Sequence, residues 1–401
     1  MIRSRLVLNF PGFEKTGAAH QLDRIAHSAA KTGNVWGFAS ERVSLEPAAD
    51  GTHAVSTWRS KGGNWQVETR LVQFAWNDII SAYEDAPHPR AFFANFPKFL
   101  AFFTDGTAGR YFRHAKRYWG FTIFPLLLIG LFVAVTLAAS VYGLGWLGLT
   151  GAAKWIAALA LCAALTLLLC KWPGERYYLL LTINDWGFAR DMVNRSNPAI
   201  ESRYAANAAT VMSEIENSRH DEIVIVGHSF GAVWAAAALA LALEKKPGLL
   251  AGRNTVFLAL GSSLLKIALA PAGQFMRDWM KRIVAEPNLL WHEVQTKDDL
   301  IAFYKADPFA ALGIEGMKAE CRIDRVRYGE AMDRKRYRNM RKSPYRTHRQ
   351  YILYQDKRAA FDSLLRMFGP FAASELARDP DLIKQIDEAG NLADAEKQRS
   401  L

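Results

Sequence analysis

The feature that most constrains the fold is a long apolar block near the middle of the chain. No charged residue occurs in Tyr118–Ala153, and after Lys154 the apolar pattern continues through Trp155–Cys170. A membrane-spanning helix needs about 20 apolar residues, so the block predicts two spans, at roughly 119–141 and 152–171. The alternative is a buried hairpin in a soluble core. It is disfavoured because the block is very long and apolar on all sides.

Basic residues flank this block on both sides, whereas the predicted turn between the spans contains only Lys154, near its end. Positively charged flanks stay on the cytoplasmic side of a membrane, so we expect both large segments to be cytoplasmic. A sheet with strands from both sides of the block would also need an even number of crossings. The predicted location is the membrane, with two spans. The flanking basic residues are Arg110, Arg113, Lys116, Arg117, Lys171 and Arg176.

Short apolar strands alternate with helical patterns on either side of the block. This alternation predicts an α/β fold with a mostly parallel sheet and helices on both faces. We expect residues 1–110 and 177–372 to form one domain, 111–176 the hairpin, and 373–401 a polar, frayed or disordered tail. The expected strands are Arg5–Phe10, Val35–Leu45, Thr52–Trp58, Trp65–Trp76, Glu222–Val226, Thr255–Leu260 and Leu289–Thr296, and the expected helices are Ala199–Arg219, Phe230–Lys246 and Leu264–Val284.

The most informative motif is Gly-His-Ser-Phe-Gly at residues 227–231. It directly follows the apolar run Ile223–Val226 and opens an alanine-rich helical pattern. Glycines on both sides of the serine let the strand and the helix pass closely, and the helix N-terminus favours developing negative charge. This strand–turn–helix setting predicts that Ser229 is a nucleophile. The alternative is a structural turn whose serine does no chemistry.

With this motif the sequence resembles the α/β-hydrolase superfamily, and in particular its lipases and esterases. The resemblance covers roughly residues 4–80 and 195–365, with the hairpin as an insertion. It implies an α/β-hydrolase fold interrupted by a two-helix transmembrane hairpin. It also implies a Ser-His-Asp triad in the chain order serine, acid, histidine. No metal or organic cofactor is expected.

The resemblance places the acid at the end of a strand that follows the motif. Leu289–Thr296 is such a strand, and Asp298 and Asp299 come after it. Asp299 is favoured because the Asp-Leu-Ile that it begins resembles the Asp-Pro-Val or Asp-Pro-Ile of the family; Asp298 remains the alternative. His348 is the histidine that follows both aspartates. His292 precedes them in mid-strand, where a core or surface role is expected.

The resemblance also implies an oxyanion hole made of two backbone N–H groups. One is the N–H of Phe230, directly after the serine. The other is expected in the loop after the first strand, where Pro11-Gly12-Phe13 resembles the His-Gly loop of lipases with proline in place of histidine. The N–H of Phe13 is the candidate.

The balance of charge predicts an anionic partner. The chain has 50 Lys and Arg against 39 Asp and Glu, a formal charge of +11, and basic residues concentrate around His348. Anionic lipid headgroups are the expected partner of Arg334, Lys335, Arg336 and Arg338. Nucleic acid is not expected, because no recognised binding motif accompanies the charge. The three cysteines do not predict a disulfide framework.

These features together predict a membrane-anchored serine hydrolase. It would cleave acyl or lipid esters through Ser229, His348 and Asp299, with an acyl-enzyme intermediate. An acyl thioesterase is the enzymatic alternative, because the Gly-His-Ser-Phe-Gly motif also resembles thioesterase motifs. The alternative from another class is a catalytically silent membrane scaffold with the same fold.

Overall fold

A computed structural model describes residues 1–393 of the chain, which form two compact units. The sheet unit consists of Met1–Asp78 and the chain from Asn197 onward, and the helical unit consists of Ile79–Ser196. The helical unit extends beyond the predicted hairpin, 111–176, at both of its ends.

The sheet unit is built on eight strands in the order β2-β3-β4-β1-β5-β6-β7-β8. Strand β3 runs antiparallel to β2 and β4, and the other neighbouring pairs are parallel. The predicted α/β architecture with a mostly parallel sheet is confirmed. The strands are β1 Ser4–Phe10, β2 Ala39–Pro47, β3 His53–Lys61, β4 Gln66–Phe74, β5 Glu222–His228, β6 Thr255–Leu260, β7 Leu289–Thr296 and β8 Glu320–Val326.

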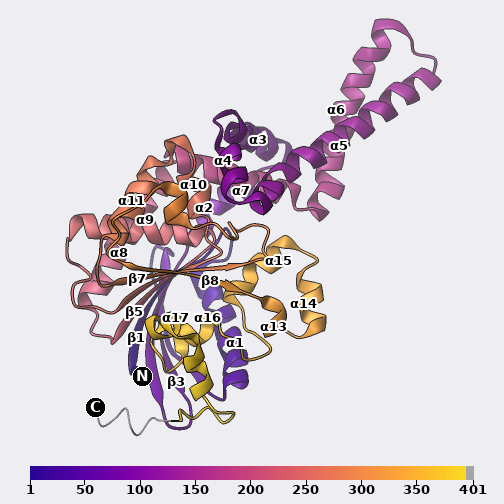
Figure 1. Ribbon diagram of the computed structural model, residues 1–401. Helices are drawn as coiled ribbons and strands as arrows, with labels where there is room; N and C mark the ends of the chain where they lie inside the picture. Colours follow the sequence, from indigo (N-terminus) through magenta and orange to yellow (C-terminus); the bar gives the residue numbers. More distant parts are fainter. Residues whose placement is uncertain (394–401) are drawn as a thin grey trace. The chain divides into compact units, whose positions relative to one another are not determined.

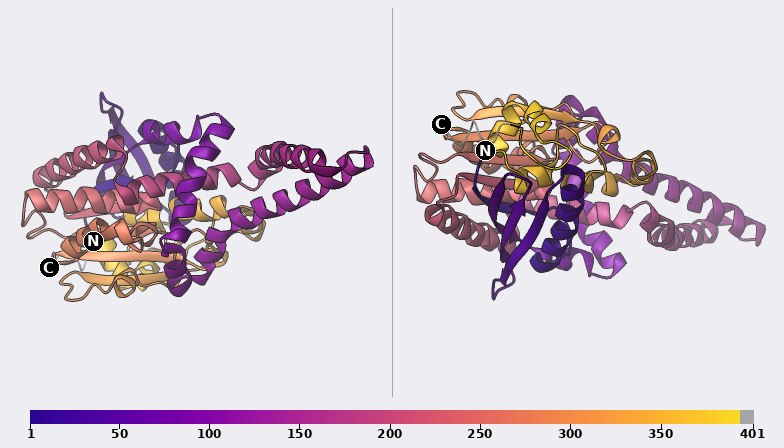
Figure 2. Two further views of the ribbon diagram at one scale, coloured as in Figure 1. Left: turned by 90° about the horizontal axis from the view of Figure 1, so that it is seen from above. Right: turned by 90° about the horizontal axis from the view of Figure 1, so that it is seen from below.

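The central strands are apolar on both sides because helices cover both faces of the sheet. Every residue of β5 is buried, as is typical of a parallel strand with two covered faces. Figure 1 shows α8, α9 and α11 on one face and α1, α16 and α17 on the other, and Figure 2 shows the two groups from above and below. These helices are α1 Ala18–Trp36, α8 Pro198–Asn217, α9 Phe230–Lys245, α11 Gln274–Val284, α16 Ser363–Phe368 and α17 Ala373–Arg378.

Three parts of the sheet unit differ from the local sequence pattern. The expected strand Val35–Leu45 starts later, because α1 occupies its first residues. Strand β8 pairs with β7 at the edge of the sheet, although Glu320–Val326 mixes charged and apolar residues. The expected helix Leu264–Val284 is divided by a proline-containing 3-10 turn. The shorter elements are α10 Leu264–Ala268, η1 Pro271–Gly273, α12 Pro308–Leu312, α13 Tyr328–Ala331, α14 Arg334–Met340, α15 Pro344–Arg349, η2 Gln350–Ile352 and η3 Pro380–Gln385.

The polar tail predicted over 373–401 is folded as far as the structure describes it. The indole Nε1 of Trp65 donates to Gly390 O at 2.8 Å, and α17 contributes apolar side chains to the core. The expectation of a frayed tail is therefore wrong for residues 373–393, and residues 394–401 lie outside the described part. The buried positions of α17 are Ala373, Ser374, Leu376 and Ala377.

Helices α5 and α6 confirm the predicted pair of long apolar helices. They span Lys116–Trp146 and Gly151–Arg176, and each is long and apolar enough to cross a membrane. Much of their apolar surface is exposed; Leu131, for example, is 58% exposed. The hydroxyls of Thr136 and Thr166 hydrogen-bond at 2.8 Å and join the two helices.

The helical unit extends beyond these two helices because aromatic side chains pack around Trp186. Its ring centroid lies 5.5 Å from that of Phe99 and 4.9 Å from that of Phe102. This packing joins the segments before and after the apolar hairpin. The remaining helices are α2 Asn77–Glu84, at the boundary between the units, α3 His88–Thr104, α4 Thr107–His114 and α7 Leu179–Asn194.

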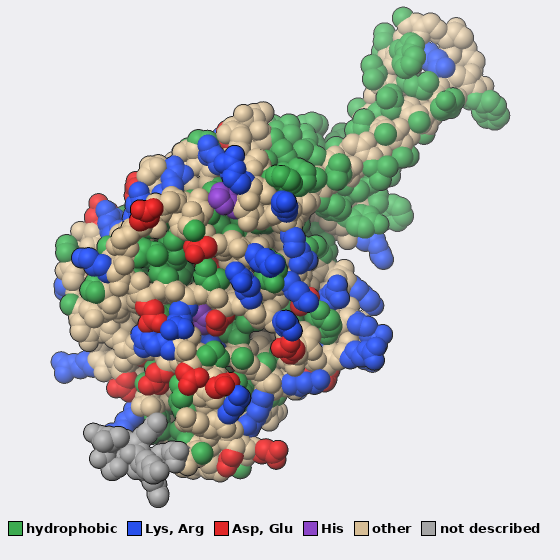
Figure 3. Space-filling model, viewed as in Figure 1, with side chains coloured by type: hydrophobic (Ala, Val, Ile, Leu, Met, Phe, Trp, Pro, Cys, Tyr) green, Lys and Arg blue, Asp and Glu red, His purple; other side chains and the backbone are tan. Residues whose placement is uncertain are grey.

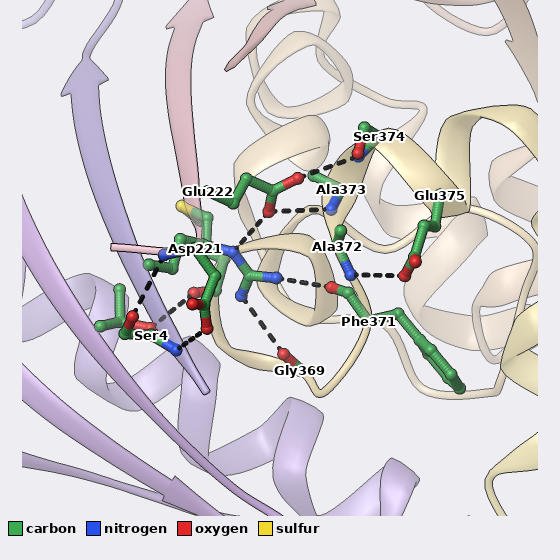
Figure 4. A network of polar contacts seen from close by, with 12 residues as sticks. Ser4, Asp221, Glu222, Gly369, Phe371, Ala372, Ala373, Ser374 and Glu375 are labelled. Carbon is green, nitrogen blue, oxygen red and sulfur yellow. Dashed lines mark hydrogen bonds and ion pairs between the residues drawn. The ribbon is translucent and has the colours of Figure 1, made fainter. Parts of the chain in front are cut away.

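The amino edge of the sheet, at which the parallel strands begin, contains a buried ion pair. Arg5 Nε donates to Glu222 Oε2 at 3.0 Å, and both side chains are fully buried. Backbone groups of residues 369–374 bind the remaining guanidinium nitrogens and the carboxylate (Figure 4). The network ties the C-terminal part of the chain to β1 and β5. The backbone partners are the carbonyls of Gly369 and Phe371 and the N–H groups of Ala373 and Ser374.

Candidate active site

Strands β1, β5, β6 and β7 end at the carboxyl edge of the sheet, together with their parallel neighbours β4 and β8. Successive strands are added on opposite sides of the β1–β5 pair, with β2, β3 and β4 on one side and β6, β7 and β8 on the other. Open α/β sheets bind ligands where the strand order reverses in this way. The segments after these strands carry predicted site residues: Phe13 follows β1, Ser229 and Phe230 follow β5, and Asp299 follows β7.

Ser229 occupies a strained turn between β5 and α9. Its φ of 58° and ψ of −124° lie in a region that residues with a side chain rarely adopt. Backbone strain of this kind clusters at functional sites. The flanking glycines make the turn possible, because a Cβ on Gly231 would overlap Phe10 O and one on Gly227 would overlap Ala232 Cα.

The backbone of Ser229 is fixed by the segment around the end of β6. Its N–H donates to Leu260 O at 3.0 Å, and its carbonyl accepts the N–H of Ser263 at 3.1 Å. The Ser229 hydroxyl lies 3.4 Å from Ser263 Oγ, and within residues 1–393 it makes no hydrogen bond to His348. No local motif marks Ser263, because its position beside the serine comes from the pairing of β5 with β6.

Asp299 and His348 form the predicted carboxylate–imidazole pair. Asp299 Oδ2 lies 2.7 Å from His348 Nδ1, and both residues are buried. The other carboxylate oxygen accepts the N–H of Ile301 at 2.8 Å. A carboxylate on Nδ1 holds the ring in the tautomer whose Nε2 accepts a proton. Asp298 instead accepts the hydroxyl of Tyr337 at 2.9 Å, so the geometry favours Asp299 as the acid.

The second ring nitrogen of His348 is left open. His348 Nε2 is buried and has no hydrogen-bond partner in the part of the chain that the structure describes. Buried polar atoms are nearly always paired. An open imidazole nitrogen whose opposite nitrogen is bound to a carboxylate can accept a proton from a hydroxyl.

His228 connects the serine turn to His348, although the sequence assigns it no role. Its Nε2 lies 2.9 Å from His348 O, and the two ring centroids are 4.8 Å apart. Burial, followed by the neighbouring His348, lowers the pKa of His228 well below its ordinary value, so its ring is neutral. A neutral ring beside a carbonyl oxygen donates from Nε2. Because His228 directly precedes Ser229, this bond links the predicted nucleophile to the predicted base.

The loop after β1 lies against the serine. A Cβ built on Gly12 would be 3.2 Å from Ser229 Cβ and 3.1 Å from His228 Nδ1. The rings of Phe13 and Phe230 have centroids 6.3 Å apart. Phe230 is the first residue of α9, so its N–H lies at the helix N-terminus, directly after Ser229. The two predicted oxyanion donors therefore belong to segments that meet beside Ser229.

His292, which the sequence places in mid-strand, lies in the core. It is buried in β7, and its Nε2 is 2.8 Å from Asp324 Oδ2. Within residues 1–393, no group of three or more His, Cys, Asp or Glu side chains could hold a metal ion.

Comparisons of the chain with protein-family models, with curated proteins and with solved structures find no match. The chemistry of the site therefore rests on its own residues.

Basic residues cover α14 and α15, the second of which carries His348. Figure 3 shows Lys and Arg side chains gathered over these helices. Arg336 is half-buried, and its guanidinium binds Asp356 Oδ1 at 2.9 Å and Tyr354 O at 3.0 Å. Arg336 therefore supports the fold. The exposed residues, which we call the basic surface, are Arg334, Lys335, Arg338, Arg341, Lys342, Arg346 and Arg349.

Proposed function

We propose that this chain is a membrane-anchored serine hydrolase of the α/β-hydrolase type that cleaves carboxylic esters. The observation that carries the proposal is the strained turn of Ser229 at the point of strand reversal, with the Asp299–His348 pair in the same site. The order serine, aspartate, histidine along the chain and the strand–turn–helix setting of the serine are typical of this class of enzyme.

In the first half of the proposed reaction, Ser229 attacks the ester carbonyl carbon while His348 Nε2 takes the hydroxyl proton. Asp299 stabilises the imidazolium that forms. The oxyanion of the tetrahedral intermediate accepts the backbone N–H groups of Phe13 and Phe230. The imidazolium then gives its proton to the departing alcohol oxygen as the carbon–oxygen bond breaks, which leaves an acyl-serine.

In the second half, water replaces the alcohol. His348 takes a proton from the water as its oxygen attacks the acyl carbon, and the same proton returns to Ser229 Oγ when the carboxylic acid leaves. Before the first step, the Ser229 hydroxyl must turn from Ser263 toward His348 Nε2 by rotation about the Cα–Cβ bond. A thioester would react by the same steps with a thiol as the leaving group.

Fluorophosphonate labelling of the full chain tests this proposal. Wild type should be labelled, and Ser229→Ala should lose labelling together with ester hydrolysis, by a factor on the order of 10⁶ where the assay reaches it. Ser213→Ala, an exposed serine on α8, is the matched control and should behave like wild type. An unlabelled wild type that is inactive on esters and thioesters would make the chain a silent scaffold.

We also propose that α5 and α6 cross a membrane and that the sheet unit is cytoplasmic. The supporting features are their exposed apolar surface and the basic residues that flank the hairpin. The full chain should resist carbonate extraction from membranes, and a tag at Gly148 should be accessible only from the side opposite to a reporter fused after Leu401. Release of the whole protein by carbonate would refute the anchor.

The basic surface is proposed to bind anionic lipid headgroups, at about 1 kcal/mol per basic residue near a membrane. Because Arg336 is bound to Asp356, the test variant leaves it intact and neutralises Arg334, Lys335 and Arg338. Vesicles with anionic lipid should raise the activity of wild type but not of this variant, and salt should reduce the gain because exposed charges are screened over about 10 Å at 0.1 M. Hydrolysis of a small soluble ester should be equal in both proteins.

A further inference from the structure

The helical unit contains an apolar cavity of about 350 Å³ between α3, α6 and α7. Phe92, Leu167, Leu179 and Leu180 supply most of its apolar wall. Protein interiors are close-packed and contain few voids larger than a water molecule, whereas ligand cavities begin at about 300 Å³. The size and the apolar lining are therefore those of a binding site for a hydrocarbon group.

The cavity lies where α6 would leave a bilayer. Its wall includes Leu167 and Lys171 near the C-terminal end of α6, and the neighbouring Trp172 is 79% exposed. An exposed tryptophan beside a lysine at the end of an apolar helix is typical of the membrane–water boundary. Leu167 itself is 37% exposed, so the cavity is continuous with the apolar surface of α6.

The polar rim of the cavity favours an anion. Lys171 is exposed there, and the start of α3, a helix of 17 residues, contributes His88 and the preceding Pro87. The dipole of a helix N-terminus attracts negative charge. The acidic residue near this rim is Glu175, whose Oε1 lies 3.3 Å from His88 Nε2.

We infer that this cavity binds one acyl chain of an anionic membrane phospholipid, whose phosphate group pairs with Lys171. The inference rests on the proposed membrane anchor, but it does not depend on the hydrolase reaction. A bilayer lipid already has its acyl chain out of water, so the cavity holds the chain by packing and not by the free energy of leaving water. One basic residue near the headgroup adds a preference of about fivefold for anionic over zwitterionic lipid.

Photo-crosslinking tests the acyl-chain site. The full chain is reconstituted into phosphatidylcholine vesicles with a minor fraction of phosphatidylglycerol that carries a diazirine on its acyl chain. After flotation and illumination, label should concentrate in residues 87–92 and 179–180. Leu167→Trp fills the cavity and should remove most of this label. The matched control is Leu159→Trp on the same helix, at a position 60% exposed and outside the cavity; it should keep the label.

The headgroup is tested with the same diazirine on phosphatidylcholine. Wild type should be labelled about fivefold more by phosphatidylglycerol, and Lys171→Gln should remove that preference. Lys154→Gln, the other lysine of α6 and not a cavity residue, should retain it.

Label spread over α5 and α6 in proportion to exposed surface, and unchanged by Leu167→Trp, would overturn the inference and leave the membrane anchor standing. Labelling by a diazirine fatty acid but not by the phospholipid would refute the assigned occupant. If the protein does not float with the vesicles, the anchor and the lipid site fail together, whereas fluorophosphonate labelling of Ser229 is judged separately.

Discussion

The amino and carboxyl edges of the sheet, where the parallel strands begin and end, both contain buried charged groups, but these groups are hydrogen-bonded differently. At the amino edge, Arg5 and Glu222 bind each other, and backbone groups of residues 369–374 bind the rest of both side chains (Figure 4). At the carboxyl edge, Asp299 binds one nitrogen of His348, and the other nitrogen has no partner in the described part of the chain.

This difference separates a structural network from a reactive one. A fully bonded buried pair can only lose stability when one member is removed. At the carboxyl edge, His348 Nε2 can accept a proton because the opposite ring nitrogen is bound to a carboxylate. The strained φ of Ser229 also points to a functional site, since backbone strain occurs mainly at such sites. The predictions below set one edge against the other.

Among the variants that compare the two edges, Asp299→Asn at the carboxyl edge should have the largest effect. The amide can no longer hold His348 in the tautomer that accepts a proton, so turnover should fall by about 10⁴-fold with little change in the melting temperature. Asp298→Asn is the matched control and should cost far less, because Asp298 binds Tyr337 and not His348. The rates of ester hydrolysis by the two variants are compared. A larger loss in Asp298→Asn than in Asp299→Asn would make Asp298 the residue that orients His348.

The amino edge should show the opposite pattern, with stability lost and turnover kept. Arg5→Met leaves the Glu222 carboxylate buried without its cation, which costs about 3–5 kcal/mol. The melting temperature should drop on the order of 10 °C. The double variant Arg5→Met with Glu222→Gln should recover part of the loss, because no unpaired charge remains. Thermal unfolding in detergent measures both, and a large fall in turnover well below the melting temperature would break the comparison.

Glu293 on β7 lies between these two cases, because it is buried and hydrogen-bonded but its protonation depends on pH. It is buried, and its donors are the Ser262 hydroxyl at 2.6 Å and the Trp291 indole N–H at 3.4 Å. Burial raises the pKa of Glu293 from 4.5 to about 7. The folded state therefore keeps a proton that the unfolded chain loses between these two values. The stability that Glu293 contributes is complete below pH 4.5 and is lost as the pH rises through about 7.

Glu293→Gln should remove this pH dependence. Between about pH 4.5 and 8, the stability of wild type relative to the variant should fall by on the order of 3 kcal/mol. Free energies of unfolding at the two ends of this range measure the change. Glu330→Gln, at an exposed position, is the control and should run parallel to wild type. A Glu293→Gln curve that also runs parallel would mean that the carboxyl is already ionised in the folded protein.

The parts of the molecule that the sequence predicts are those determined by local pattern. The run Ile223–Val226 and the motif after it predict β5, the turn of Ser229 and α9, because the signals are contiguous. The resemblance to the α/β-hydrolases, through its chain order of serine, acid and histidine, predicts that His348 pairs with Asp299 or Asp298, and the structure shows the pair with Asp299. The length of the apolar block predicts α5 and α6.

The parts that the sequence does not predict depend on contacts between distant segments. Ser263 lies beside Ser229 only because β6 is the neighbour of β5, and His228 supports His348 across 120 residues. Strand β8 carries charged residues at an edge of the sheet, where an apolar run is not needed. The position of β1 between β4 and β5 is likewise a property of the assembled sheet, and it is this position that brings Gly12 to the serine.

Gly12 gives the smallest effect and the sharpest test of how the carboxyl edge is built. A Cβ at this position would lie 3.1 Å from His228 Nδ1 and 3.2 Å from Ser229 Cβ, so Gly12→Ala should push the β1 loop or the serine turn by a few tenths of an ångström. Small displacements of reacting groups reduce rate steeply, and a shift of 1 Å can cost about 10²-fold. We therefore expect a loss of about tenfold in kcat, with a nearly unchanged melting temperature, measured on a soluble ester. Gly109→Ala, at a helical position with nothing within 4 Å of the new Cβ, is the control and should keep full activity. Full activity in Gly12→Ala would mean that the loop after β1 does not approach the reacting atoms, and Phe13 would then lose its place as an oxyanion donor.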